Sequence, residues 1–146
     1  MARPSVSEQY ADHLASLLEA GEELTGVCAA SEQQGVFKGR GVVLAITDRR
    51  LLVIGLDRRG RPDGEPIPIV PEDIAAAHAD GAGGDWAELT AAVMDSSAVK
   101  LKLTLRDGGK HKFMLMRGTG PLGGLGGGEE QRNGLEALAA FLARTG

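Results

Sequence analysis

Two adjacent apolar segments, residues 41–47 and 50–56, constrain the fold of this 146-residue chain more than any other feature. Both are rich in aliphatic and β-branched residues, and only Asp48 and Arg49 separate them, a spacing that predicts an antiparallel β-hairpin. Thr47 and Asp48 can hydrogen-bond to neighbouring backbone amides and so stabilise the reversal. Because nearly every position in the two segments is apolar, we expect other elements to cover this hairpin on both faces. It should form the centre of the core.

A second hairpin is predicted further along the chain. Residues 99–106 alternate apolar side chains with lysine, threonine and arginine, the pattern of a strand with one buried face. The turn residues Asp107-Gly108-Gly109 follow, and residues 110–117 return as the antiparallel partner. Residues 24–33 predict an earlier strand, and the proline-containing stretch 66–80 predicts an edge strand with a bend.

Helices are predicted at both ends of the chain. Apolar residues recur at helical intervals from Val6 to Leu18, and Gly21 has the residue type favoured just past a helix end. We expect one domain over residues 1–146, divided into an N-terminal helix (1–21), strands (22–117), a glycine-rich linker (118–128) and a C-terminal helix (129–146). The predicted fold class is α+β, mainly β: an antiparallel barrel or sandwich of about seven strands. The C-terminal helix either caps this barrel or stays undocked to bind a partner.

Composition and charge narrow the classes of protein that fit. Hydrophobic residues make up 42% and charged residues 25%, as in ordinary globular proteins. No apolar run reaches the roughly 18 residues that cross a bilayer, and acidic residues stand where a secretory signal would be apolar, so a cytoplasmic location is expected. The net charge of −4 argues against general nucleic-acid binding. Residues 38–61 nevertheless carry five more basic than acidic side chains.

Residues that could carry catalysis or hold a metal are sparse. The only cysteine, Cys28, allows neither an internal disulfide nor a cysteine-based metal site, and it is expected to be a small buried residue. His13, His78 and His111 form no metal-binding motif. Residues 118–123 satisfy GxGxxG, but neither a following parallel strand nor the required acidic residue is present. We therefore expect no enzyme activity, no cofactor and no metal.

Basic residues of two loops form the candidate ligand site. If consecutive strands run up and down, the loops at residues 34–40 and 58–65 emerge at the same end of the barrel. The candidate residues are Lys38, Arg40, Arg58, Arg59 and Arg61. Convergent lysines and arginines can hold a phosphate or an acidic group through charge-assisted hydrogen bonds. The alternative is a solvated loop without a ligand, because Asp57, Asp63 and Glu65 dilute the positive charge.

The turn residues Thr47, Asp48, Arg49 and Arg50 are assigned a structural role instead. They lie at the opposite end of the hairpin from the two basic loops. Arg50 is expected to extend its stem along the barrel and pair with a carboxylate such as Asp48 or Asp73.

Four segments carry a resemblance to a known family: LLEAGEELTGVCAAS, GVVLAITDRRLLVIG, IPIVPEDIAA and LKLTLRDGGKHKFML. Over roughly residues 17–144 the chain resembles the short bacterial pleckstrin-homology (PH) and GRAM-like domains, and its most specific element is TDRRLL at residues 47–52. The long glycine linker and the irregular middle depart from that pattern. The resemblance implies a PH-like barrel that serves as a binding scaffold, whose eukaryotic members bind phosphoinositides or proteins.

Together these observations predict a non-catalytic binding module. The leading hypothesis is an adaptor that recruits a protein partner, whose identity the sequence does not give. The alternative is binding of an anionic lipid headgroup at a membrane surface, or of a phosphorylated small molecule, through residues 38–40 and 58–61.

Overall fold

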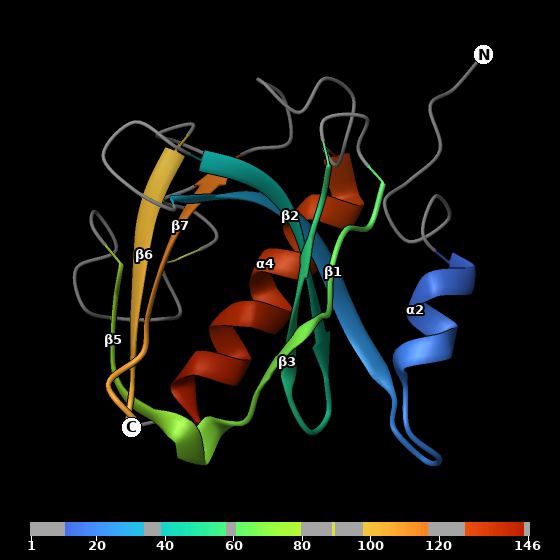
Figure 1. Cartoon of the computed structure of the whole chain (residues 1–146), viewed down its shortest axis with the longest axis horizontal. Helices are drawn as coiled ribbons and strands as arrows, with labels where there is room; N and C mark the ends of the chain where they lie inside the picture. Colours follow the sequence, from blue (N-terminus) through green and yellow to red (C-terminus); the bar gives the residue numbers. More distant parts are fainter. Residues whose placement is uncertain are drawn as a thin grey trace.

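Seven antiparallel strands form one curled sheet in a computed structural model that describes residues 11–33, 39–57, 61–79, 89, 98–116 and 128–144. The strand order is β4-β3-β2-β1-β7-β6-β5 (Figure 1). The strands are β1 (Leu24–Gln33), β2 (Gly39–Thr47), β3 (Leu51–Gly55), β4 (Ile67–Ile69), β5 (Ile74–Ala79), β6 (Ala98–Leu105) and β7 (Lys110–Met116). Two helices, α2 (Ala11–Leu17) and α4 (Gly128–Ala143), and the short 3-10 helix η1 (Pro71–Asp73) accompany them. The expectation of a mainly β fold is confirmed.

The hairpin of β2 and β3 is covered on both faces, as its sequence predicts. Val42 lies opposite Gly55 and Ile46 opposite Leu51, and every residue of β3 is buried. Leu44 and its alternate neighbours face the interior of the curl, where α4 packs. Val43 and Ala45 face the other side, where Leu14 of α2 packs against them. This double coverage explains why both strands are apolar at nearly every position.

The C-terminal helix α4 lies inside the curl of the sheet (Figure 1). Leu135, Leu138 and Leu142 are fully buried against the sheet, and most of the helix contacts are with β1. The approach is close because glycines face each other: a β-carbon at Gly26 would lie 2.7 Å from the β-carbon of Ala137, and one at Gly134 would overlap the carbonyl oxygen of Val27. The capping arrangement is therefore observed, and the undocked alternative is not.

The N-terminal helix ends earlier than the sequence predicts. We expected it to continue to about residue 20, but α2 ends at Leu17. Arg50 donates from Nη2 to the carbonyl oxygen of Leu17 at 2.9 Å, and the Glu22 carboxylate accepts the amide of Glu19 at 3.0 Å. These contacts, one from the β2–β3 turn and one local, satisfy backbone groups that a further helical turn would have used. Gly21 adopts a φ of +78° in the turn that follows.

The second predicted hairpin is confirmed as β6 and β7. Gly108 has a φ of +94°, and the amide of Gly109 donates to the Asp107 carboxylate at 2.8 Å. Pro68 lies in β4 and Pro71 in η1. The segment predicted as one bent edge strand forms two strands, β4 and β5, which lie at the two opposite edges of the sheet. Residues 118–127 of the glycine-rich linker and most of residues 80–97 lie outside the described residues, whereas Gly128, predicted as the end of the linker, begins α4.

Cys28 is fully buried, and burial raises the pKa of its thiol to about 12. Because the thiolate is the reactive form, we expect iodoacetamide to leave Cys28 unmodified in the folded protein at neutral pH. Mass spectrometry of native and urea-unfolded samples measures this directly. Equal alkylation rates in the two samples would contradict the burial.

Candidate functional site

The turn between β2 and β3 is locked to the segment that follows α2. The Arg50 guanidinium donates two hydrogen bonds of 2.9 Å to the Glu22 carboxylate, from Nε to Oε2 and from Nη2 to Oε1. Thr47 donates its hydroxyl to Glu22 Oε2 at 2.7 Å and accepts the amide of Arg50 at 3.0 Å. The side chain of Glu22 is fully buried. Hydrogen bonding to Arg50 lowers the pKa of Glu22 from 4.5 to about 2, with backbone and Thr47 hydrogen bonds adding to the effect.

The partner of Arg50 differs from the two that the sequence suggested. It pairs with Glu22 rather than with Asp48 or Asp73. Asp48 binds the backbone of Glu23 instead: its carboxylate accepts the amide of Glu23 at 2.9 Å, and its own amide donates to the Glu23 carbonyl at 3.0 Å. The geometry of two parallel hydrogen bonds between guanidinium and carboxylate makes this contact specific for arginine. The turn residues thus hold the fold together.

Arg40, one of the five candidate ligand residues, is paired inside the protein. Glu32 lies opposite it on β1 and accepts from Arg40 Nη2 at 3.3 Å, while the other Glu32 oxygen lies 3.0 Å from Nδ1 of His111. The hydrogen bond with His111, followed by the electrostatic interactions with His111 and then with Arg40, holds the pKa of Glu32 below its usual range. The guanidinium of Arg40 packs over Gly55, where a β-carbon would lie 2.6 Å from Arg40 Cζ. The positive charge of Arg40 is therefore offset by Glu32.

Arg61 is exposed at the end of the β2–β3 hairpin where Arg40 lies. Its amide donates to the Asp57 carboxylate at 3.0 Å, and its carbonyl accepts the amide of Asp57 at 2.9 Å, which closes the loop directly after β3. β2 begins and β3 ends at this end of the sheet, but residues 34–38 and 58–60 lie outside the described residues, so the convergence of the two basic loops stays a prediction. The other three candidates, Lys38, Arg58 and Arg59, lie outside the described residues.

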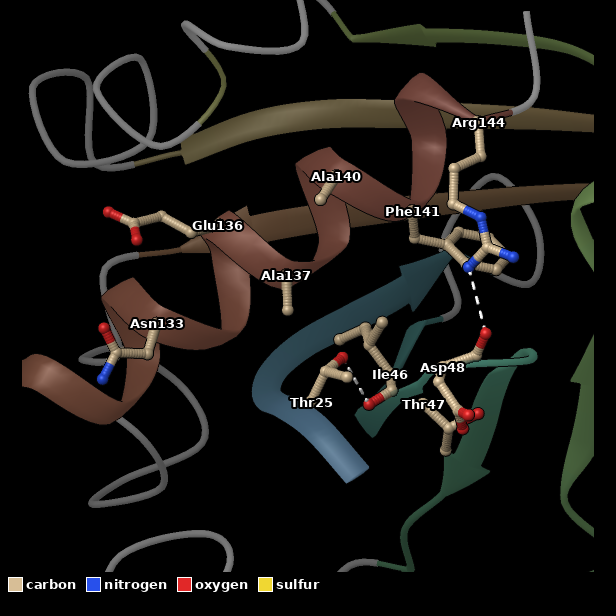
Figure 2. A pocket seen from close by; sticks show the side chains of 10 residues that line it. All are labelled: Thr25, Ile46, Thr47, Asp48, Asn133, Glu136, Ala137, Ala140, Phe141 and Arg144. Carbon is tan, nitrogen blue, oxygen red and sulfur yellow. Dashed lines mark hydrogen bonds between the residues drawn. The ribbon is translucent and has the colours of Figure 1, made fainter. Parts of the chain in front are cut away.

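An open groove runs along α4 where the helix passes the turn end of β1 and β2 (Figure 2). Its volume is about 480 Å³, within the range of small-molecule pockets. The apolar lining consists of Ile46, Ala137, Ala140 and Phe141. The polar lining consists of Thr25, Thr47, Asp48, Asn133, Glu136 and Arg144.

The polar groups of the groove retain unused hydrogen-bonding capacity. Arg144 reaches from the end of α4 to the carbonyl of Asp48 at 3.2 Å, which uses one of its five N–H donors (Figure 2). Asn133 and Glu136 are exposed, and within the described part of the chain neither side chain makes a hydrogen bond or ion pair. The groove therefore combines an apolar floor with polar groups that can receive a ligand.

Sequence reasoning did not find this groove because its walls come from distant segments. The floor joins Ile46 of β2 to Ala137 of α4, which approach each other only after the helix docks on Gly26. The available signal was the pair of small residues at positions 134 and 137 of the amphipathic helix, which marks a face that packs closely.

Among the described residues, no cluster of three or more histidine, cysteine, aspartate or glutamate side chains could hold a metal ion. The helices of this part of the chain are too short or too polar to cross a bilayer. Comparisons with protein-family models, with curated proteins and with solved structures find no match to this chain.

Proposed function

We propose that this protein is a non-catalytic binding module of the PH-like kind, which holds a short segment of a protein partner in the groove between α4 and strands β1 and β2. The groove itself is the observation that supports this function most: it is open, has an apolar floor and carries unpaired polar groups at its margin. Because fold alone does not determine function, the argument rests on the site.

The lining indicates the chemistry of the partner segment. Ala137 and Ala140 leave room beside Phe141 for one apolar side chain. At one end Arg144 can donate to a carboxylate, and further along α4 Glu136 can accept from a basic side chain. The complementary segment therefore has an apolar residue between an acidic and a basic one.

The surrounding structure makes the groove rigid. β1 and β2 lie within the sheet rather than at its edge, and α4 is held by its close approach to β1. The bond from Glu22 to Arg50 fixes the turn that carries Asp48 at the margin of the groove. A preorganised site reduces the entropy lost on binding.

The alternative of an anionic ligand at residues 38–40 and 58–61 receives less support. Arg40 is paired with Glu32, and that carboxylate would repel a phosphate placed beside it. No described contact favours this alternative over the groove.

Filling the groove should abolish peptide binding without unfolding the protein. Ala140 is exposed on α4, so Ala140→Tyr places a ring in the groove without overpacking the core. Peptides selected from a random displayed library against wild type should bind Ala140→Tyr at least about tenfold more weakly, equivalent to about 1.4 kcal/mol. Fluorescence anisotropy measures the dissociation constants.

The matched control is Ala143→Tyr, which changes an exposed alanine on the same helix that does not line the groove. The control should bind the selected peptides as wild type does. Peptides that bind both variants equally, or a selection that enriches no acidic–apolar–basic pattern, would refute the assignment.

A further inference from the structure

The outer face of the β6–β7 hairpin carries four lysines. Lys102 lies directly opposite Lys112, and Lys110 lies opposite Thr104, so the strand register places all four on one face. The alternate side chains of these strands, Leu101, Leu103, Phe113 and Leu115, are buried on the inner face. We call this surface the lysine face, defined by Lys100, Lys102, Lys110 and Lys112.

The lysine face is unusual for a protein with a net charge of −4. It holds four of the five lysines in the chain, whose other basic residues are arginines apart from Lys38. The only acidic residue between Lys100 and Lys112 is Asp107, in the turn. Within the described residues, none of the four lysines has a carboxylate at ion-pair distance. This concentration of charge is not neutralised locally.

Folding does not account for this arrangement. Like charges directly opposite each other on neighbouring strands, such as Lys102 and Lys112, destabilise a sheet. Lysines can protect sheet edges from aggregation, but the edges here are β4 and β5, whereas β6 and β7 are interior strands. Repulsion between neighbouring side chains that lowers the stability of the sheet, and that has no structural benefit, is characteristic of a functional surface.

The charges of the whole molecule are also separated. α2 lies beyond β1, on the opposite side of the molecule from β5, β6 and β7 (Figure 1). The α2 region carries the exposed carboxylates Asp12, Glu19 and Glu23. Such a charge distribution orients a protein in an electric field, with the lysine face directed toward a negative surface.

We infer that the lysine face docks on an anionic lipid bilayer. Side chains on a sheet stand roughly perpendicular to it, so these four ammonium groups are spread over a surface and do not converge on one phosphate. Lysine is a hydrated point charge, which suits attraction to many mobile headgroups better than two-bond recognition of a single group. Each lysine near an anionic membrane adds to the attraction.

Other acidic macromolecules fit the lysine face less well. A two-stranded ribbon can enter the major groove of DNA, but β6 and β7 are flanked by β5 and β1 and cannot enter it. Protein partners are usually anchored by aromatic or large apolar side chains in pockets, whereas the apolar side chain among these lysines is the half-buried Met114. A bilayer requires no such anchor for electrostatic adsorption.

The lysine face and the groove can be used at the same time. α4 packs on the inner face of the sheet, whereas the lysines lie on the outer face. A module docked on a bilayer through β6 and β7 therefore leaves the α4 groove open. Each site can bind its partner whether or not the other does.

Vesicle flotation with purified full-length protein tests the inference. Vesicles of phosphatidylcholine mixed with phosphatidylserine should carry wild-type protein upward, whereas pure phosphatidylcholine vesicles should not. Lys102→Gln/Lys112→Gln should lower the partition coefficient about 25-fold, since each lysine contributes about fivefold. Raising the salt from about 0.1 M to about 1 M, which shortens the Debye length from about 10 Å to about 3 Å, should release wild type.

The matched control is Arg58→Gln/Arg59→Gln, which removes the same charge from the loop where the sequence predicted an anionic site. This control should partition within about twofold of wild type if the lysine face makes the contact. Lys100→Gln/Lys110→Gln provides a second pair of substitutions on the lysine face, and circular dichroism verifies that each variant is folded.

Three results would overturn the inference. In the first, anionic vesicles at low salt do not retain wild type. In the second, the Lys102/Lys112 variant floats as wild type does, while the loop variant is lost. In the third, wild type binds immobilised polyglutamate through Lys102 and Lys112 but not anionic vesicles, which assigns the face to an acidic protein. The peptide-binding measurement at the groove is independent of all three results.

Discussion

Gly134→Ala is expected to destabilise the protein by about 2 kcal/mol, although alanine stabilises an isolated helix by about 1 kcal/mol relative to glycine. The added β-carbon would overlap the Val27 carbonyl oxygen and would lie 2.9 Å from the β-carbon of Cys28. Both obstacles belong to β1, near the centre of the sheet, so α4 has to move away instead. Urea unfolding followed by circular dichroism measures the change in the free energy of unfolding.

The matched control is Ala140→Gly, at an exposed position in the interior of the same helix. It should lose only the intrinsic helix preference, about 1 kcal/mol. A Gly134→Ala variant that is more stable than wild type would show that propensity outweighs packing and that α4 lies further from β1. Because the groove lies between α4 and the sheet, the destabilised variant should also bind the selected peptides more weakly.

Glu22→Gln should lower the free energy of unfolding at neutral pH by about 2 kcal/mol, because hydrogen bonds to charged groups contribute about 1.5–3 kcal/mol. The amide keeps the shape of the side chain but offers Arg50 one neutral acceptor instead of two charged oxygens. Part of the positive charge of Arg50 would then lie unpaired beneath α2. Thermal or urea unfolding at neutral pH measures the loss, and the exposed neighbour Glu23 provides a Glu23→Gln control.

The same residue should determine part of the acid sensitivity. The folded state holds the pKa of Glu22 at about 2, against 4.5 in the absence of its partners. Between these values the unfolded chain binds more protons than the folded one, so stability falls as the pH is lowered through this window. The stabilisation is complete above the unfolded pKa and is lost near the folded one.

Wild type should therefore lose more stability than Glu22→Gln when the pH falls from about 5 to about 2. Glu32, whose pKa is also lowered, contributes to acid sensitivity in both proteins, so the difference between the two curves isolates Glu22. Parallel curves for wild type and Glu22→Gln would contradict the role of this carboxylate.

The regular elements follow from local patterns in the sequence. The β2–β3 hairpin can be read from two apolar segments around Asp48 and Arg49, and the β6–β7 hairpin from alternation around a Gly-Gly turn. The predicted first strand, residues 24–33, coincides with β1. Periodicity within a strand depends on neighbouring residues alone, so no long-range information is needed to find it.

The contacts of the candidate sites depend on long-range register. Arg40 and Glu32 become opposite neighbours only through the pairing of β1 with β2, and this pairing converts a predicted ligand residue into an internal ion pair. Arg50 reaches Glu22 across 28 residues, which no pattern near the turn reveals. The alternation of lysines in residues 99–106 was visible, but the register with Lys112 was needed to create one charged face.

The sequence by itself determined that residues 41–56 would form a buried hairpin, because apolar β-branched segments around a turn can satisfy their backbone and bury their side chains in few other ways. The tertiary structure alone decided what lies on each face of that hairpin. α4 packs on one side through Gly26 and Gly134, and α2 is held on the other through Arg50 and Glu22. These choices depend on the shapes and charges of surfaces that meet only after the sheet has formed, and local periodicity contains no information about them.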